Sequence, residues 1–358
     1  MIYVHVPFCK QFCTYCDFYS EIASDGCFKA YADSACAEIK RRAGEMDDNP
    51  KTLYFGGGTP SVLPLSVLTR ILIALDEVGH GGPYREFTME VNPEDLVERG
   101  PAYVESLLSL GVNRVSIGVQ SFDDAMLRWM NRRHDAARAR EAFRIAREAG
   151  ADNISLDLIF GISHLPDDVW ADTVDQAVAL GPEHISCYQL TVEGDSALAD
   201  MVADGRYKEA DDTVCRRQYD ILCQKLRAAG YRHYEISNFA REGFEAVHNG
   251  GYWARRPYVG IGPGAHSFRG NTRSWNSKAL SGWSATTETL SDEDARVETV
   301  MLSLRTDKGA EAAFLHENCS KEAIGWLVKN GALVRVGDRY RIPEDHFFVS
   351  DEIIRELI

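Results

Sequence analysis

The sequence lacks several features that would each point to a particular class of protein. It has no run of eighteen apolar residues and no charged-then-apolar leader, which argues against a spanning helix or a secretion signal. No basic stripe is evident and the net charge is −15, so nucleic acid is a poor candidate for a partner. We therefore expect a soluble cytoplasmic protein.

Cysteine is scarce, with nine residues in 358, and the number is odd. A fold stabilised mainly by disulfide bonds is therefore disfavoured, since such folds are rich in cysteine and occur in oxidising compartments. Six of the nine are scattered, and most of these are expected to behave as small buried apolar side chains: Cys27, Cys36, Cys187, Cys215, Cys223 and Cys319.

The other three cysteines, Cys9, Cys13 and Cys16, lie in one short segment directly after a predicted strand that Pro7 ends. Thiolates are the ligands of iron–sulfur clusters, and the usual [4Fe–4S] cluster takes four of them. No fourth cysteine lies near Cys16, so one iron of such a cluster would stay open to a small molecule. A zinc site wants a second ligand pair and a redox dithiol needs only two cysteines, so both are weaker alternatives.

The pattern Cys9-x-x-x-Cys13-x-x-Cys16, with an aromatic residue at Tyr15, resembles the signature of the radical S-adenosylmethionine (SAM) superfamily. The resemblance implies that SAM chelates the open iron and that the reduced cluster can cleave SAM to a 5′-deoxyadenosyl radical. It also implies that a glycine-rich segment contacts the amino group of SAM, and here that segment is Gly57, Gly58 and Thr59. Taken alone, three glycines before a helix could equally be a flexible turn.

Strand patterns alternate with helical patterns along the first half of the chain. Strands are predicted at 3–6, 51–55, 86–91, 113–119, 153–160 and 184–190, and helices at 28–43, 65–78, 102–110, 136–149 and 170–179. This alternation predicts parallel strands with both faces covered. Six units are too few for the closed eight-unit barrel, so we predict an α/β fold with a partial, open (β/α)6 barrel, which is also the radical SAM fold.

Polar residues lie near the ends of several strands, where chemistry collects in such folds: Glu90, Gln120 and Asp157. Each alone could simply be hydrogen-bonded to a loop. Together they resemble the oxygen-independent coproporphyrinogen III oxidase family. That resemblance implies one set of contacts to the SAM at the cluster: Tyr3, Tyr15, Gly57 and Glu90. It implies a second set of polar contacts deeper in the pocket, where the family holds another SAM: Thr59, Gln120, Arg132 and Asp157.

Two departures weaken the oxidase interpretation. The oxidase has a further cysteine two residues after the third, where this sequence has Phe18, and it has an N-terminal extension for which we expect no counterpart here. The segment 234–240 and the motif from His248 to Trp253 resemble instead the HemW group of haem chaperones. This implies that His248 contacts haem and that Tyr252 and Trp253 stack on the porphyrin. The alternative for this motif is a surface loop with a hydrophobic anchor.

A second glycine-rich stretch, residues 260–267, ends near His266. In the related oxidase this region touches SAM, so His266 is a further candidate, although a tight loop is the simpler interpretation. Helices predicted at 295–304 and 321–329, followed by a hairpin at 332–342, indicate a small winged-helix-like module. We therefore predict a radical SAM partial barrel at 1–240, a connecting segment with the HNxxYW motif at 241–290, and a C-terminal winged-helix-like domain at 291–358. The acidic chain argues against DNA binding by this domain, and the family resemblance implies that it is a lid or docking module.

The leading hypothesis is a HemW-like haem chaperone that binds haem and a SAM-ligated [4Fe–4S] cluster. It would deliver haem to apo-haemoproteins, such as membrane respiratory enzymes, and a small electron-donor protein is a further expected partner. The alternatives are a radical SAM enzyme acting on a porphyrin or porphyrinogen, such as an anaerobic coproporphyrinogen III dehydrogenase, and an iron–sulfur protein in which SAM is only structural.

Overall fold

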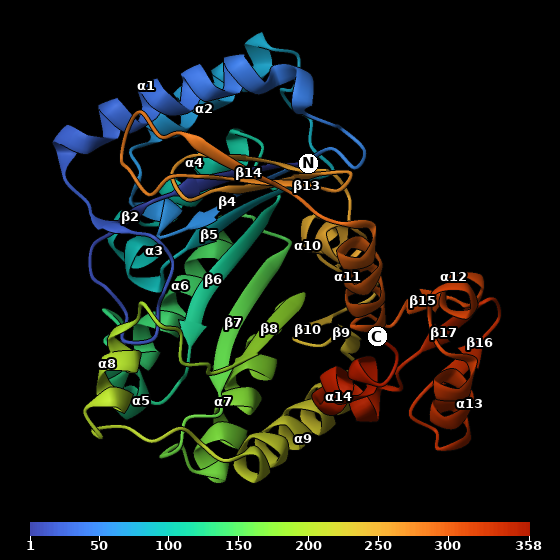
Figure 1. Cartoon of the computed structure of the whole chain (residues 1–358). Helices are drawn as coiled ribbons and strands as arrows, with labels where there is room; N and C mark the ends of the chain where they lie inside the picture. Colours follow the sequence, from blue (N-terminus) through green and yellow to red (C-terminus); the bar gives the residue numbers. More distant parts are fainter.

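A nine-stranded sheet forms the centre of the computed structural model, which describes residues 1–358 apart from the side chain of Asp25 (Figure 1). The order is β11-β1-β4-β5-β6-β7-β8-β10-β9. Neighbours from β11 to β8 pair in parallel, whereas β10 is antiparallel to β8 and β9. The strands are β1 (Ile2–Val6), β4 (Thr52–Gly57), β5 (Glu86–Val91), β6 (Arg114–Gln120), β7 (Ile154–Phe160), β8 (His184–Gln189), β9 (Arg232–Glu235), β10 (Asn238–Ala240) and β11 (Val259–Ile261). The predicted α/β fold and its six parallel strands are confirmed, and β11 adds a seventh parallel strand at the edge.

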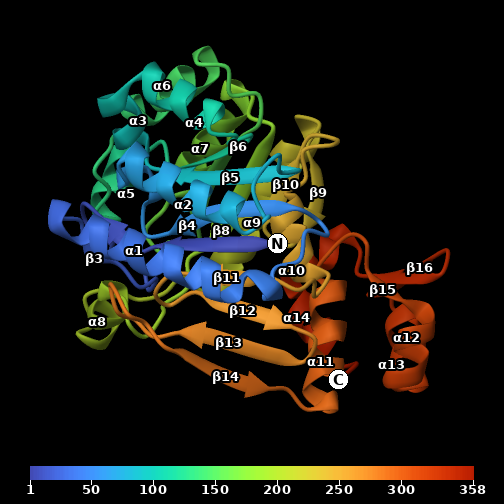
Figure 2. The ribbon, with the colours of Figure 1, turned by 90° about the horizontal axis from the view of Figure 1, so that it is seen from above.

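Helices connect these strands and lie outside the sheet, where several of them pack on one another (Figure 2). They are α1 (Asp25–Arg42), α2 (Leu65–Glu77), α3 (Pro93–Arg99), α4 (Pro101–Ser109), α5 (Asp124–Trp129), α6 (Ala136–Glu148), α7 (Asp167–Leu180), α8 (Ala197–Ala203) and α9 (Asp212–Ala228). Helix α6 shows how the sequence sets their limits. The Asp135 carboxylate accepts the Arg138 amide as a cap at its start, and Gly150 with φ +96° follows its end.

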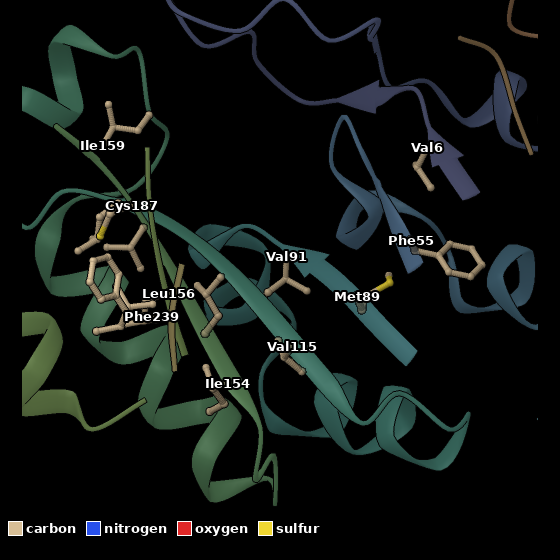
Figure 3. Packing of buried hydrophobic residues seen from close by; sticks show 14 of the residues in the cluster. Val6, Phe55, Met89, Val91, Val115, Ile154, Leu156, Ile159, Cys187 and Phe239 are labelled. Atoms are coloured by element: carbon tan, nitrogen blue, oxygen red, sulfur yellow. The ribbon is translucent and has the colours of Figure 1, made fainter. Parts of the chain in front are cut away.

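The core between sheet and helices is made by apolar side chains of neighbouring strands, several of which are drawn in Figure 3. Phe55, Met89, Val115 and Leu156 come from four adjacent strands and are almost fully buried. Full burial of a side chain of this size contributes roughly 1.5–3 kcal/mol relative to exposure. The sheet is therefore a rigid base for the polar side chains at its two ends.

The segment after residue 240 adds to the main sheet, because β11 pairs with β1 through Ile2↔Val259 and Val4↔Ile261. The His248–Trp253 motif forms a helix, α10 (Val247–Trp253), and is not a loop. A separate sheet continues beyond β11 in Figure 2, built from β12 (His266–Arg269), β13 (Thr272–Asn276) and β14 (Ala285–Thr289). The domain limits at 240 and 290 stay predictions.

The C-terminal part begins with α11 (Asp292–Leu304), which starts with a capping box between Ser291 and Asp294. It continues with β15 (Ala310–Glu311), α12 (Ala312–Asn318), α13 (Lys321–Lys329), β16 (Val334–Val336), β17 (Arg339–Arg341) and α14 (Ser350–Arg355). Strands β15–β17 and helices α12 and α13 project from the main body in Figures 1 and 2. None of the described helices combines the length and apolarity needed to cross a membrane.

Candidate functional site

The three clustered cysteines lie in a loop that is fixed at both ends. Short strands β2 (Phe8–Cys9) and β3 (Glu21–Ile22) pair in parallel where it starts and finishes. The Ala23 amide donates to the Cys9 carbonyl at 2.8 Å. The middle of the loop is held by Thr14, whose amide donates to the Met130 carbonyl at 3.0 Å and whose carbonyl accepts the Leu198 amide at 2.8 Å. These bonds fix the course of the loop that carries the three thiols.

All three thiols are free; Cys9 is buried, and Cys13 and Cys16 are half-buried. Burial raises the pKa of Cys9, and burial together with the Cys13 and Cys9 thiols raises the pKa of Cys16 to about 11. Iron would therefore bind with release of protons. Among the described side chains, no three His, Cys, Asp or Glu groups surround the position of a single metal ion. Three thiols on one fixed loop fit instead a cluster that offers a separate iron to each thiolate.

Arg132 connects this loop to the strand ends. Its Nη1 donates to Cys13 Sγ at 3.2 Å and lies 3.5 Å from the Tyr15 hydroxyl, while its Nη2 donates to the Gly118 carbonyl at 2.7 Å and to Asn92 Oδ1. Its Nε is buried without a partner in the described structure. A buried, unsatisfied guanidinium donor suits an anionic ligand such as a carboxylate.

The glycine-rich segment after β4 packs beneath the cysteine loop. The Gly58 amide donates to the Val6 carbonyl at 2.8 Å and the Thr59 amide to the Phe8 carbonyl at 2.7 Å. Thr59 Oγ1 lies 3.5 Å from Cys9 Sγ. Gly57 has φ +108°, and a Cβ there would overlap the His5 ring. The packing of β1 on β4 therefore already requires glycine here, and a contact of this segment with SAM stays a prediction.

Glu90 lies beside Gly57 on the neighbouring strand. Its Oε1 accepts the Tyr54 hydroxyl at 2.6 Å and its Oε2 accepts the Gly57 amide at 3.2 Å. Burial raises the pKa of Glu90 to about 7, the Asp157 carboxylate acts in the same direction, and the two hydrogen bonds oppose both. The ring of Tyr3 is 6.0 Å from that of Tyr54. Two predicted SAM contacts, Tyr3 and Glu90, are thus joined through Tyr54.

Asp157 and Gln120 lie on the next strands. Both Asp157 oxygens are 3.2 Å from Ser116 Oγ, and burial raises the pKa of this carboxyl. Gln120 has φ +67° at an irregularity between β6 and β7. A Cβ on Gly118 would lie 3.0 Å from the Gln120 amide nitrogen and 3.4 Å from Arg132 Nη2, so these side chains are neighbours. Positive φ in a residue other than glycine is concentrated at functional sites.

The predicted haem residues lie on the N-terminal side of the sheet, but the His248 ring is only 5.2 Å from the ring of Tyr54, which also donates to Glu90. His248 is fully buried, with Nδ1 2.8 Å from Thr52 Oγ1 and Nε2 2.8 Å from the Tyr252 hydroxyl. The His248 amide donates to Glu86 at 3.0 Å. Thr52 and Glu86 begin β4 and β5, whereas the cysteines follow the end of β1. Burial lowers the pKa of His248 to about 3, so the ring is neutral, but both nitrogens are already hydrogen-bonded. The assignment of His248 to haem stays a prediction.

His266 lies at the cluster end and not with His248. It begins β12, is exposed, and stacks on Trp275 with ring centroids 6.0 Å apart. The preceding turn packs on β1, since a Cβ on Gly262 would lie 2.6 Å from the His5 carbonyl oxygen. His266 is therefore close enough to the cluster loop to be considered with it.

Two residues at this site were missed from the sequence. Asn92 directly follows β5, donates to Thr59 Oγ1 at 3.2 Å and accepts from Arg132. Glu90 was singled out because polar residues at the ends of parallel strands collect at the site, and the same reasoning could have found Asn92. Asn131, with φ +57°, donates to the Phe12 carbonyl at 2.7 Å. The sequence around Asn131 does not predict its role, because its partner Phe12 is 119 residues away.

The buried Glu90 carboxyl leads to a prediction about stability and pH. Its folded pKa of about 7 is above its ordinary 4.5. The unfolded chain therefore loses this proton first as pH rises, and the contribution of Glu90 to wild-type stability falls between about pH 4.5 and 7 and is level above. We expect the free energy of unfolding of Glu90→Gln to rise by about 2–3 kcal/mol relative to that of the wild type as the pH is raised through this interval. Urea unfolding of the metal-free protein measures it. Glu141→Gln, at an exposed glutamate paired with Arg144, is the control. A difference between Glu90→Gln and wild type that does not change with pH would contradict the buried, protonated carboxyl.

Comparisons with known proteins identify the class of protein to which this chain belongs. The family model described as the Radical SAM superfamily matches residues 3–177, a range that contains the cysteine loop, Gly57, Glu90 and Asp157. Proteins of this superfamily use a [4Fe–4S] cluster and SAM. The coproporphyrinogen III oxidase HemN from Escherichia coli, a radical SAM enzyme, superimposes with a TM-score of 0.80 at 21% identity. The match covers 99% of this chain and 89% of that one, and it shows a shared fold.

Curated relatives narrow the class to one family. The heme chaperone HemW from Mycobacterium tuberculosis (strain H37Rv) is 34% identical over 371 residues, which cover 100% of this chain and 94% of that protein. HemW from Synechocystis sp. is 33% identical over 337 residues, covering 87% and 79%. The chain belongs to the HemW family of radical SAM proteins. The resemblance inferred from the cysteine loop and the His248–Trp253 motif is therefore confirmed.

Proposed function

We propose that this protein is a haem chaperone that binds haem together with a SAM-capped [4Fe–4S] cluster and transfers the haem to apo-haemoproteins. The observation that carries the proposal is the 34% identity to a heme chaperone along the whole chain. We further propose membrane respiratory enzymes as acceptors and a small electron-donor protein as a partner. Nine free cysteines suit a reducing compartment such as the cytoplasm.

In this proposal Cys9, Cys13 and Cys16 each bind one iron and leave the fourth iron to SAM. The cluster supplies, when bound, an iron that holds SAM and can pass it an electron. Arg132 is placed to donate from its free Nε to a carboxylate, and its bond to Cys13 stabilises the thiolate form of that ligand. The remaining residues expected to line this pocket are Tyr3, Tyr15, Gly57, Gly58, Thr59, Gln120, Asp157 and His266.

In this proposal Glu90 receives the amino group of SAM. Its pKa of about 7 means that a cationic ligand beside it will favour the ionised form. The Tyr54 hydroxyl and the Gly57 amide then hold the carboxylate in one orientation. Glu90 therefore orients the ligand without leaving its place in the sheet.

On the N-terminal side of the sheet, Trp253 lines one cavity and Tyr252 lines a second one, and Arg256 lines both. In this proposal haem meets Trp253 first. His248 becomes available to haem iron only when it releases Thr52 or Tyr252, because both of its nitrogens are hydrogen-bonded. We propose that binding of haem draws Tyr252 away and frees Nε2. This would couple loading of the chaperone to a local rearrangement of α10.

The test is a hemin titration of anaerobically reconstituted protein, followed by visible absorbance and then by transfer to an apo-haemoprotein. We expect about one haem per chain with a shifted Soret band, and at least roughly tenfold weaker binding in His248→Ala. His316→Ala is the matched control, since His316 Nε2 is likewise hydrogen-bonded to a tyrosine, Tyr340, at 3.1 Å. Absence of binding in the wild type, or release of carbon dioxide from coproporphyrinogen III, would replace the chaperone proposal by an enzyme.

A further inference from the structure

A cavity of about 630 Å³ lies at the N-terminal edge of the main sheet. Its walls come from residues just before β4 and β5, from α10, from the end of α11 and from β17. In Figure 1, α10 and α11 stand between the sheet and the projecting C-terminal elements. The volume is typical of pockets for organic ligands, which run from about 300 to 1,000 Å³.

The walls of this cavity carry five cationic side chains but only two acidic ones. Both acidic groups, Glu245 and Asp307, pair with Arg232. Arg339 is likewise engaged, because it donates to the Lys308 and Gly309 carbonyls at 2.8 Å.

The other three cations, Arg85, Arg256 and Lys308, form no ion pair or side-chain hydrogen bond with any described residue. In a chain with a net charge of −15, such a concentration of uncompensated positive charge favours an anionic ligand.

The cavity also offers an apolar wall and free space. Trp253 lines it, and the indole Nε1 of this residue is buried without a described partner. Gly250, on the same helix, lines it too, and a Cβ there would meet nothing within 4 Å. An aromatic plane beside a bare helix surface leaves room for a flat ring system.

We propose that this cavity is the haem seat, in which Arg85, Arg256 and Lys308 bind the two propionate carboxylates and Trp253 contacts the porphyrin. The inference rests on the proposed haem-chaperone function and adds to it the groups that recognise the ligand. The seat lies at the N-terminal edge of the sheet, whereas the cysteine loop follows the C-terminal end of β1. Haem binding is read from the Soret band and cluster content from iron and sulfide analysis, so the two are measured separately.

The experiment titrates hemin and hemin dimethyl ester into the reconstituted protein and its variants. The wild type should bind hemin at least roughly tenfold more tightly than the uncharged ester. In the triple variant R85Q/R256Q/K308Q, hemin affinity should fall roughly ten- to hundredfold and the preference over the ester should vanish. The triple variant K208Q/K321Q/R355Q removes three exposed cations that form no ion pair with a described side chain and lie outside the cavity wall, and should behave as wild type.

A second variant tests whether the ligand needs the free volume of the cavity, and it leaves the charged residues of the cavity unchanged. Gly250→Leu should fill the cavity and weaken both ligands alike, while an unchanged cluster spectrum reports that the fold is intact. Hemin binding that is equal in the wild type and in R85Q/R256Q/K308Q, or equal for hemin and its ester in the wild type, would overturn the seat but leave the chaperone proposal standing. Failure of the wild type to bind hemin at all would overturn the chaperone proposal itself.

Discussion

Replacement of Cys13 by alanine is expected to reduce the iron retained after anaerobic reconstitution from about four atoms per chain to below one. The loop offers three thiols, and two cannot hold a cluster whose fourth iron already lacks a protein ligand. The change also removes the Sγ that accepts from Arg132 Nη1, leaving more of a buried guanidinium unsatisfied. The measurements are iron and sulfide content and the visible charge-transfer absorbance of the cluster.

Cys36→Ala provides the matched control for this change. Cys36 is buried in the core on α1, away from the cysteine loop, and its Sγ donates to the Arg70 carbonyl at 3.7 Å, so its loss should leave iron content at the wild-type level. Circular dichroism should show the same helix and strand content in both variants. Full iron content and an unaltered cluster spectrum in Cys13→Ala would mean that the cysteine loop does not hold the cluster.

The second large effect is expected from Gly57→Ala, with a loss of about 3 kcal/mol or more in the free energy of unfolding. Alanine at φ +108° is strained, at a cost of roughly 1–3 kcal/mol, and its methyl group would overlap the His5 ring. The ring cannot move cheaply, because Nδ1 lies 3.0 Å from the Tyr3 hydroxyl and Nε2 2.9 Å from the Tyr19 carbonyl. Chemical denaturation of the metal-free protein measures the loss.

Because the Tyr19 carbonyl belongs to the cysteine loop, displacement of His5 should also lower the yield of reconstituted cluster in Gly57→Ala. Gly44→Ala is the control: its Cβ would meet nothing within 4 Å and its φ is not positive. A stability within about 1 kcal/mol of wild type for Gly57→Ala would show that β1 and β4 can separate at this point.

The main sheet and its cluster end could be predicted from the sequence because their signals are local. Apolar runs of strand length alternate with helical periods, and the cysteines occupy one loop after the first strand. Polar residues such as Glu90 and Asp157 then meet because parallel strands end at the same edge. Arg132 was included through a resemblance, but its contact with Cys13 bridges 119 residues and has no local sign.

The haem motif could not be placed in the same way. Two consecutive glycines in the His248–Trp253 segment suggest a loop, yet the segment forms α10 because tertiary contacts outweigh local propensity. The partner of His248, Thr52, is 196 residues away. Strand β11 was also missed, since three residues give too short a pattern to detect.

The pairing of β1 with β11 has a consequence for the order of events during synthesis. The strand that precedes the cysteine loop leaves the ribosome first, but one of its edges stays open until Val259–Ile261 has been made. At about 5–20 residues per second this delay is on the order of 10–50 s. The Gly262 amide then bonds Glu38 at 2.9 Å and fastens α1 over the same edge. Iron that reached the nascent loop before this point would therefore meet a sheet that still lacks one of its strands.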